Sequence, residues 1–387
     1  MAPLLSSRRP RAGGNNRRRF ESCSDSDLLT RYTGTAPSSR TISGVRRCRR
    51  PYRLYAQLIK LLKSFLKFAA HRSGAIHLVQ QLNRDRLRIL MYHRFPAQHA
   101  DAFDRQCAFL ASRYQVVSLP EALARLWNHQ PIENLAVLTI DDGYADMAEV
   151  AFPILRKHRL PATLFVTTGF IDQTHWMPGD RVRSLLDQTT LALTADDGTV
   201  HHFSATGPNA SDDLGALLKR VPNRTRTRIL AELASAAGQP SAAPPPPEYR
   251  PCTWDQLREM SRNGITIGAH TVSHPILSRL ETAEETEREI LDSKITLERR
   301  LETPVTVFAY PNGMKEDLSP TAIACVRAQF AGAVTAIYGL NATGVDPYCL
   351  YRLPGEPDMS VPDLARMLAG PLRHRQPAPI TPLQKAG

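Results

Sequence analysis

Short apolar runs alternate with helical stretches through the middle of the chain. The runs are rich in aliphatic and β-branched residues, as strands are, and they cover residues 87–92, 136–140, 162–167, 265–267, 305–308 and 333–336. Apolar positions recur at helical spacing near 145–158, 283–301 and 320–330. Repeated strand-then-helix units imply a parallel sheet with helices packed outside it. With this many units, we expect the sheet to close into a barrel.

The alternation is interrupted over about residues 173–250. A mostly helical pattern around 213–237 is followed by a proline-rich run over 238–247, which is typical of a stiff, extended connector. The predicted fold class is therefore α/β, a (β/α) barrel that carries a mostly helical insertion over one end of the sheet. We expect the barrel domain to span 87–356 and a C-terminal helix and tail to follow over 357–387.

The net charge of +12 is concentrated at the start of the chain. Residues 1–53 carry +10 and residues 54–90 carry +6, which leaves −4 for the remainder. A slightly acidic body presents no general phosphate-binding field, so we expect no nucleic-acid partner. Residues 1–53 lack sustained apolar periodicity and are expected to be a disordered basic arm.

Residues 54–86 are expected to form a helical lead-in to the barrel. Within residues 54–70, Lys60, Lys63 and Lys67 are spaced at helical intervals among Leu, Ile and Phe. Such a basic amphipathic helix either lies on an anionic membrane surface or packs on the domain with its lysines in water. Residues 1–53 show no clear signal peptide, and we expect the cell envelope or the membrane periphery rather than the cytoplasm. The oligomeric state is not predicted.

The first candidate for chemistry is a pair of carboxylates at a strand end, in Leu138-Thr-Ile-Asp-Asp-Gly-Tyr144. Successive strand side chains point to opposite faces, so Asp141 and Asp142 cannot normally address one point. Gly143 permits a sharp turn, after which one carboxylate can bind a metal while the other reaches the metal's water. The alternative is a turn with two solvated acids.

The second candidate is the spacing of His270 and His274, directly after the predicted strand at 265–267. An extended chain would separate the two rings by roughly 13 Å. If the chain turns helical after His270, the two Cβ atoms lie about 5 to 6 Å apart and both imidazoles can bind one ion. The spacing therefore indicates a metal pair at a strand-to-helix junction, the alternative being two ordinary loop histidines.

Together, the two candidates supply two histidines and one carboxylate. This is the protein ligand set of a catalytic zinc-type site with open positions, and also that of non-heme iron enzymes. Both motifs follow predicted strands, whose carboxyl ends meet at one face of a parallel barrel. We therefore expect them to form one site.

Three stretches, 139–143, 270–275 and 308–313, resemble the signatures of the polysaccharide deacetylase family, also called the NodB-homology or carbohydrate esterase 4 family. The third is similar to the variant in bacterial exopolysaccharide deacetylases, and the resemblance covers roughly 87–354. It implies a distorted (β/α) barrel of the NodB type, a divalent metal ion, often Zn²⁺, and hydrolytic removal of acetyl groups from N-acetylated sugars. The alternatives are a catalytically weak carbohydrate-binding protein and a two-histidine, one-carboxylate iron enzyme.

By this resemblance, Asp142, His270 and His274 look like the metal ligands. Asp141 looks like the general base that deprotonates the attacking water. The implied substrate is an N-acetylglucosamine-containing polysaccharide or oligosaccharide.

The third stretch departs from the pattern of many relatives. Ala309 stands where they have an arginine, and Arg352 is our candidate to orient the base instead. The backbone amide of Tyr310 matches the position that helps to hold the oxyanion. Pro311 and Asn312 on the same turn are expected to contact substrate.

The general acid in many relatives is a histidine in a late Leu-x-His motif. His374 completes such a motif, but it lies in a basic, proline-rich tail without a strand pattern. His93 directly follows the predicted strand at 87–92 and completes a similar Met-x-His pattern with Met91, and we predict that it protonates the leaving amine. The alternative is a structural histidine that closes the strand.

Two further residues begin the insertion near the expected mouth of the site. Trp176 could stack on a sugar ring or anchor the insertion. Asp180 follows it in Trp-Met-Pro-Gly-Asp, and both are predicted to contact substrate.

Overall fold

The computed structural model describes residues 75–194, 200–204, 209–240 and 243–371. The predicted basic arm, the amphipathic segment 54–70 and His374 lie outside these ranges. The barrel, its helices and the insertion lie within them. No helix in the described ranges is both long enough and apolar enough to cross a membrane.

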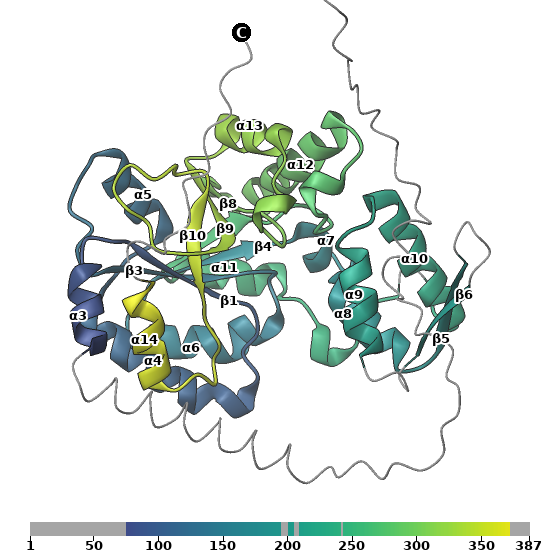
Figure 1. The fold of residues 1–387 in the computed structure, drawn as a ribbon, viewed down its shortest axis with the longest axis horizontal. Coiled ribbons are helices and arrows are strands. Elements are labelled where there is room, and N and C mark those ends of the chain that lie inside the picture. The colour runs from purple at the N-terminus through teal and green to yellow at the C-terminus, as the bar shows by residue number, and fades with distance from the viewer. Residues whose placement is uncertain (1–74, 195–199, 205–208, 241–242, 372–387) are drawn as a thin grey trace, which may run out of the picture.

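Parallel strands form a closed ring at the centre of the structure (Figure 1). In spatial order, the ring contains β1 (Arg88–Tyr92), β10 (Leu350–Pro354), β9 (Gly332–Tyr338), β8 (Val307–Ala309), β7 (Ile265–Ala269), β4 (Ala162–Val166) and β3 (Leu135–Ile140). Pairing of β1 with β3 completes it, and the short β2 (Gln115–Val116) adds to β3. The register shifts between Leu350 and Arg352. The predicted (β/α) barrel is thus confirmed, and the shift and the short β8 distort it.

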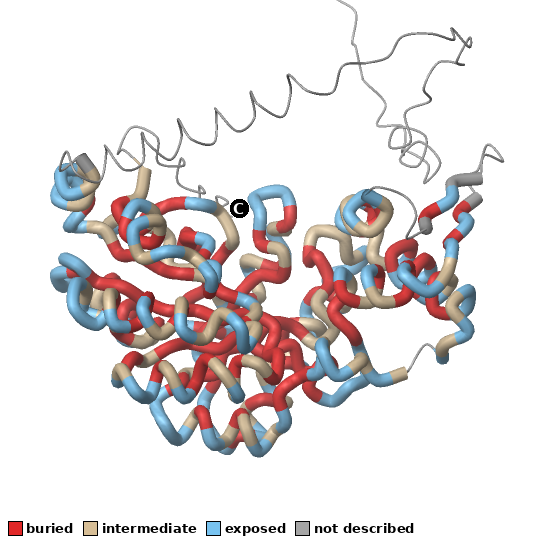
Figure 2. Tube along the Cα trace, turned by 90° about the horizontal axis from the view of Figure 1, so that it is seen from below, coloured by how far each residue is buried: buried red, intermediate tan, exposed pale blue. Residues whose placement is uncertain are grey.

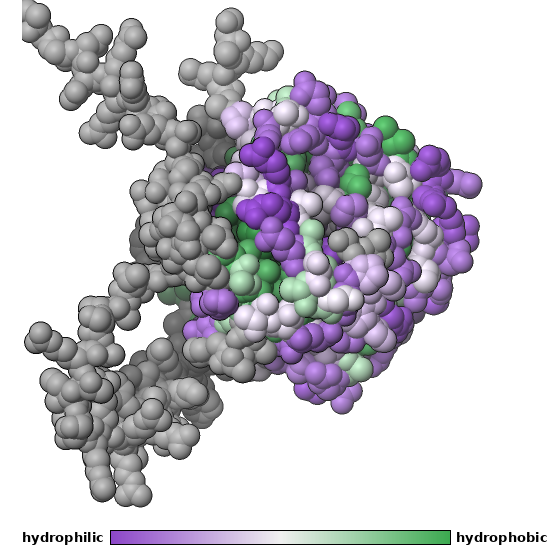
Figure 3. Space-filling model, turned by 90° about the vertical axis from the view of Figure 1, so that its right-hand side faces the viewer, coloured by the Kyte–Doolittle hydropathy of each residue, from purple (hydrophilic) through white to green (hydrophobic). Residues whose placement is uncertain are grey.

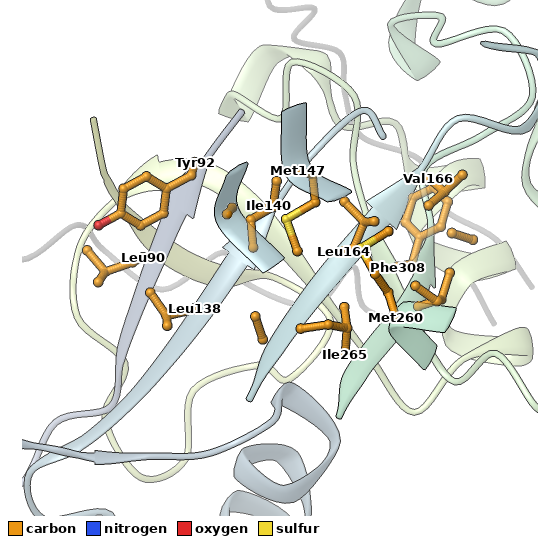
Figure 4. Packing of buried hydrophobic residues seen from close by; sticks show 14 of the residues in the cluster. Leu90, Tyr92, Leu138, Ile140, Met147, Leu164, Val166, Met260, Ile265 and Phe308 are labelled. Atoms are coloured by element: carbon orange, nitrogen blue, oxygen red, sulfur yellow. The ribbon is translucent and has the colours of Figure 1, made fainter. Parts of the chain in front are cut away.

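Alternate side chains of the strands enter two different hydrophobic clusters. Residues such as Ile89, Val137 and Phe165 pack together with α5 (Leu119–Trp127). Their strand neighbours, among them Leu90 and Ile140, pack with the helices around the ring (Figure 4). Buried residues accordingly gather in the middle of the molecule and exposed ones at its outer helices (Figure 2). β3 is buried along its whole length and is apolar except for Thr139, as expected of a strand that is covered on both faces.

The other elements around the barrel are helical. They are α3 (Ala75–Leu82), α4 (Ala100–Arg113), α6 (Phe152–Lys157) after a π-helical turn (Met147–Ala151), α7 (Thr168–Ile171), α11 (Trp254–Arg262), α12 (Ala283–Leu301), α13 (Pro320–Gln329), α14 (Val361–Ala369) and single 3-10 turns at Ala97–His99, Pro247–Tyr249, Leu277–Arg279 and Lys315–Asp317. Ser118, Thr282 and Ser319 cap their helices by accepting a hydrogen bond from a first-turn amide. Such caps end the loops sharply and fix where each helix begins.

The insertion forms a lobe beside the barrel (Figure 1). It contains α8 (Pro178–Leu186), an antiparallel hairpin of β5 (Thr190–Thr194) and β6 (Val200–Ser204), α9 (Ala210–Leu218) and α10 (Asn223–Ala236). Its own hydrophobic cluster contains residues from all these elements. The insertion is mostly helical, as predicted, but the hairpin was not expected. The face on its side of the molecule is largely hydrophilic, with hydrophobic residues gathered in part of it (Figure 3).

A glycine in β7 lets the ring close tightly. A Cβ atom at Gly268 would lie 2.5 Å from a ring carbon of Phe165, its register partner on β4. We predict that Gly268→Ala lowers the free energy of unfolding by about 1–3 kcal/mol, measured by urea denaturation, because the surrounding core cannot yield without strain. Gly215→Ala in α9 is the matched control, since nothing lies within 4 Å there and alanine favours a helix. Equal stability of wild type and Gly268→Ala would contradict the prediction.

Candidate active site

The two adjacent aspartates turn sharply at the end of β3. Asp142 has a φ of 78° and Gly143 a φ of 95°, both in the left-handed region that aspartate tolerates better than most residues. The Gly143 amide donates to the Asp141 carbonyl over 3.0 Å. This turn lets the carboxylates of Asp141 and Asp142 face one site, as was predicted from Gly143.

The segment that returns from the insertion supports the same turn. The Cys252 amide donates to the Gly143 carbonyl over 2.8 Å, and the Ala145 amide donates to the Arg250 carbonyl over 3.0 Å. These bonds form an antiparallel bridge between Tyr144 and Pro251. The insertion therefore ends against the Asp-Asp turn.

The two histidines lie on a loop, so the predicted helical turn after His270 is wrong. Thr271 and His274 have φ values of 67° and 56°, outside the right-handed helical region. Pro275 disfavours the helical conformation at the residue before it. The Thr271 hydroxyl accepts from the His274 amide over 3.1 Å and so helps to hold the folded-back loop.

The loop still brings both rings to Asp142. Asp142 Oδ1 lies 3.6 Å from His270 Nε2 and 3.5 Å from His274 Nε2. One possible ligand atom from each of the three residues lies within 4.8 Å of the others. Tetrahedral ligands at about 2.1 Å from an ion are about 3.4 Å apart. The three residues therefore fit a single divalent metal ion.

Hydrogen bonding and burial prepare the histidines as ligands. His270 Nδ1 lies 2.7 Å from the Ala309 carbonyl oxygen, which assigns the proton to Nδ1 and leaves the Nε2 lone pair for a metal. Burial, then the charges of His270 and Arg226, holds the pKa of His274 well below its ordinary value. A neutral imidazole is the form that binds metal.

Asp141 forms a two-pronged ion pair with Arg352 of β10. Both terminal guanidinium nitrogens of Arg352 lie 2.7 Å from a carboxylate oxygen of Asp141. Asp141 is 2% exposed and Arg352 is 1% exposed. Arg352 Nε also donates to the Thr335 carbonyl over 2.6 Å. Burial alone would raise the pKa of Asp141, but the charge and hydrogen bonds of Arg352 bring it well below its ordinary value. Asp141 is therefore ionised at neutral pH, as a proton acceptor must be.

His93 lies directly after β1, beside Asp141. Its Nε2 is 3.8 Å from Asp141 Oδ2, and its side chain is 46% exposed. The Asp141 amide donates to the Tyr92 carbonyl over 2.9 Å, so pairing of β1 with β3 sets this arrangement. The structure thus brings together all five residues predicted as acid, base and metal ligands, which are His93, Asp141, Asp142, His270 and His274.

The predicted role of the Tyr310 amide is corrected. This amide already donates to the Val334 carbonyl over 3.2 Å, within the barrel. Pro311 has no amide hydrogen to offer. Asn312 is the next residue, and among described residues its amide donates to no backbone carbonyl; its side-chain amide donates to Asp317. The occupation of the Tyr310 amide could not be predicted from the sequence, because its pairing with Val334 depends on the closed ring.

Trp176 and Asp180, which were predicted to contact substrate, are buried at the start of the insertion. Trp176 is 8% exposed, and its indole N–H donates to the Ala243 carbonyl, so it anchors the insertion and offers no open face for a sugar. Asp180 is equally buried. It accepts from the Tyr144 hydroxyl and pairs with Arg183 over 3.2 Å, which connects the insertion to the Asp-Asp turn.

Comparison with known proteins identifies the family. The family model described as "Polysaccharide deacetylase" matches residues 128–327, which contain the two aspartates and the two loop histidines. The chain therefore belongs to the polysaccharide deacetylase family, hydrolases that act on carbon–nitrogen bonds other than peptide bonds. His93 and Arg352 lie outside the matched range.

Individual relatives are distant. The chain is 23% identical over 282 residues to YxkH of Bacillus subtilis strain 168, which carries the name of a polysaccharide deacetylase, with 71% of this chain and 73% of YxkH covered. Among solved structures, the Streptococcus pyogenes deacetylase PplD in complex with acetate is 22% identical, with a TM-score of 0.49 over 74% of this chain and 99% of PplD. IcaB from Ammonifex degensii is 20% identical, with a TM-score of 0.48 over 74% and 98% of the two chains.

The ion pair between Asp141 and Arg352 is expected to stabilise the barrel as well as orient the base. We predict that Arg352→Met lowers the free energy of unfolding at pH 7 by about 3–5 kcal/mol, because it leaves a buried carboxylate unpaired. Arg366→Met, which breaks an exposed pair with Asp363, is the control and should cost about 0–1 kcal/mol.

The pH dependence has a definite sign. The folded pKa of Asp141 lies below the unfolded value of about 3.9, so the stabilisation is complete above that pH and lost as the pH falls through the folded pKa. In Arg352→Met, burial without the cation raises the folded pKa of Asp141, so the difference between wild type and variant should be largest at neutral pH and above and shrink as the pH falls towards about 4 and below it. Denaturation curves across this range measure the difference, and one that stays constant from neutral pH down to about pH 3 would be inconsistent with the ion pair.

Proposed function

We propose that this protein is a metal-dependent deacetylase that removes acetyl groups from N-acetylated sugars. The observation that carries the proposal is the convergence of Asp142, His270 and His274 beside the Asp141–Arg352 pair. Family membership supplies the reaction class, and these residues supply the groups that hydrolysis of an acetamide needs.

Zinc is the proposed metal. Two imidazole nitrogens and one carboxylate oxygen form a catalytic zinc ligand set with positions left for water and substrate. Burial raises the pKa of Asp142, and a bound cation would favour its ionised form. When bound, Zn²⁺ polarises the acetamide carbonyl and lowers the pKa of a water molecule.

The protein's own side chains move the protons. Asp141 accepts a proton from the attacking water, while the two hydrogen bonds from Arg352 hold its carboxylate in place. The Asn312 amide is the proposed donor to the developing oxyanion. His93 then gives a proton to the leaving nitrogen, and cleavage of the carbon–nitrogen bond releases acetate and a free sugar amine.

The proposed substrate is an N-acetylglucosamine-containing polysaccharide or oligosaccharide. The Phe308 to Gly313 segment supports it, because it is similar to the third motif of bacterial exopolysaccharide deacetylases. The exposed side chain of His93 is also compatible with a polymer chain that passes over the site.

The first experiment measures acetate release from N-acetylglucosamine oligomers by the purified protein. We expect release that a chelator abolishes and Zn²⁺ restores, and that is lost in Asp141→Asn and His270→Ala. Asp255→Asn, on a side chain that is 92% exposed, is the matched carboxylate control and should retain full activity. Absence of release with zinc bound would reject this substrate, and oxygen-dependent turnover with iron would reject the reaction.

The role of His93 is tested separately. His93→Ala should reduce turnover about 10²- to 10⁴-fold, as expected for loss of a general acid, because the leaving amine is no longer protonated. Metal content should stay at the wild-type level, since His93 is not among the grouped ligands. Turnover equal to wild type, measured as acetate release at saturating substrate, would assign His93 a structural role only.

A further inference from the structure

An arginine of the insertion reaches the loop that carries the metal-binding histidines. Arg226 of α10 donates from a terminal guanidinium nitrogen to the His274 carbonyl over 3.1 Å. Arg226 is only 8% exposed. The insertion therefore contacts the backbone of a candidate metal ligand directly.

The position of Arg226 is not explained by its own helix. It lies in the N-terminal part of α10, where the helix dipole disfavours a positive charge. Among the described residues, its buried Nε has no hydrogen-bond partner, which is an unfavourable arrangement for a donor. Burial lowers the pKa of Arg226 to about 10, with the charge of Glu289 acting in the opposite direction, so the group remains charged at neutral pH. Its contacts outside α10 must account for its placement.

A residue of the barrel holds the same loop from another element. Glu289 of α12 accepts hydrogen bonds from the Val272 and Ser273 amides, each over 2.9 Å. Its second oxygen accepts from the Ser273 hydroxyl over 2.5 Å. Arg226 and Glu289 thus bind nearby peptide groups of the same loop with opposite charges.

The loop needs such support because its backbone is irregular. His274 has a left-handed φ of 56°, which costs a non-glycine residue free energy unless its surroundings compensate. The direction of its imidazole depends on this backbone conformation. In the structure His274 Nε2 lies 3.5 Å from Asp142 Oδ1, and a small rotation of this backbone would increase that distance.

We propose that Arg226 is a positioning residue of the metal centre, which holds the His274 carbonyl so that the imidazole points at the ion. The insertion then contributes a residue to the support of the metal site. This inference rests on the metal centre of the proposed function.

The experiment measures Zn²⁺ affinity by competition with a chromophoric chelator, without any sugar substrate. Arg226→Met should weaken zinc binding about 10- to 100-fold, the usual effect of losing a partner behind a ligand. Arg226→Lys should restore affinity to within about threefold of wild type, because one N–H donor suffices for the single bond to the carbonyl. Arg228→Met, which removes an exposed arginine of the same helix paired with Glu232, is the control and should bind like wild type.

The outcomes separate the inference from the proposed metal centre. Wild-type protein that binds no zinc would overturn the metal centre itself. Zinc affinity of folded Arg226→Met equal to wild type, or an Arg226→Lys variant as weak as Arg226→Met, would overturn the positioning role. If Arg226→Met does not fold, Arg226→Gln takes its place with the same expectation, since its shorter side chain cannot reach the carbonyl. Circular dichroism of the metal-free proteins establishes folding.

Discussion

Closure of the barrel by the first strand is the constraint on which the rest of the structure depends. β1 pairs with β10 on one side and with β3 on the other. His93, Asp141 and Arg352 follow or belong to these three strands, which are distant in the sequence and adjacent only in the closed ring. An open sheet with the same strands would leave Asp141 without its guanidinium partner.

Closure also explains how two neighbouring aspartates acquire different properties. Asp141 continues the direction of β3 and meets Arg352, which lowers its pKa. Asp142 turns out of the strand and meets two imidazoles, and burial raises its pKa. One carboxylate is thus an ionised acceptor fixed by a cation of the protein, while the other is a ligand that becomes favourable once a cation is bound. The difference arises from one left-handed turn.

Local sequence patterns located six of the seven ring strands, but not β10, and predicted the convergence of the ligands. Apolar runs located the central strands, and α12 has the predicted bounds of 283–301, because both patterns reflect burial. Interactions between distant segments were not accessible. The helical turn after His270 failed because of left-handed residues before Pro275, and the Tyr310 amide was assigned to an oxyanion because its pairing with Val334 appears only after folding. The roles of the site residues remain predictions.

The insertion has its own hydrophobic core but is attached at both halves of the proposed metal site. It ends in the segment that bonds to the Gly143 carbonyl, and Arg226 bonds to the His274 carbonyl. A protein engineer who wished to change substrate range could exchange the interior of this lobe for another small fold. Such a graft would have to reproduce the two attachment points, because a lobe that merely fits the gap would loosen the metal.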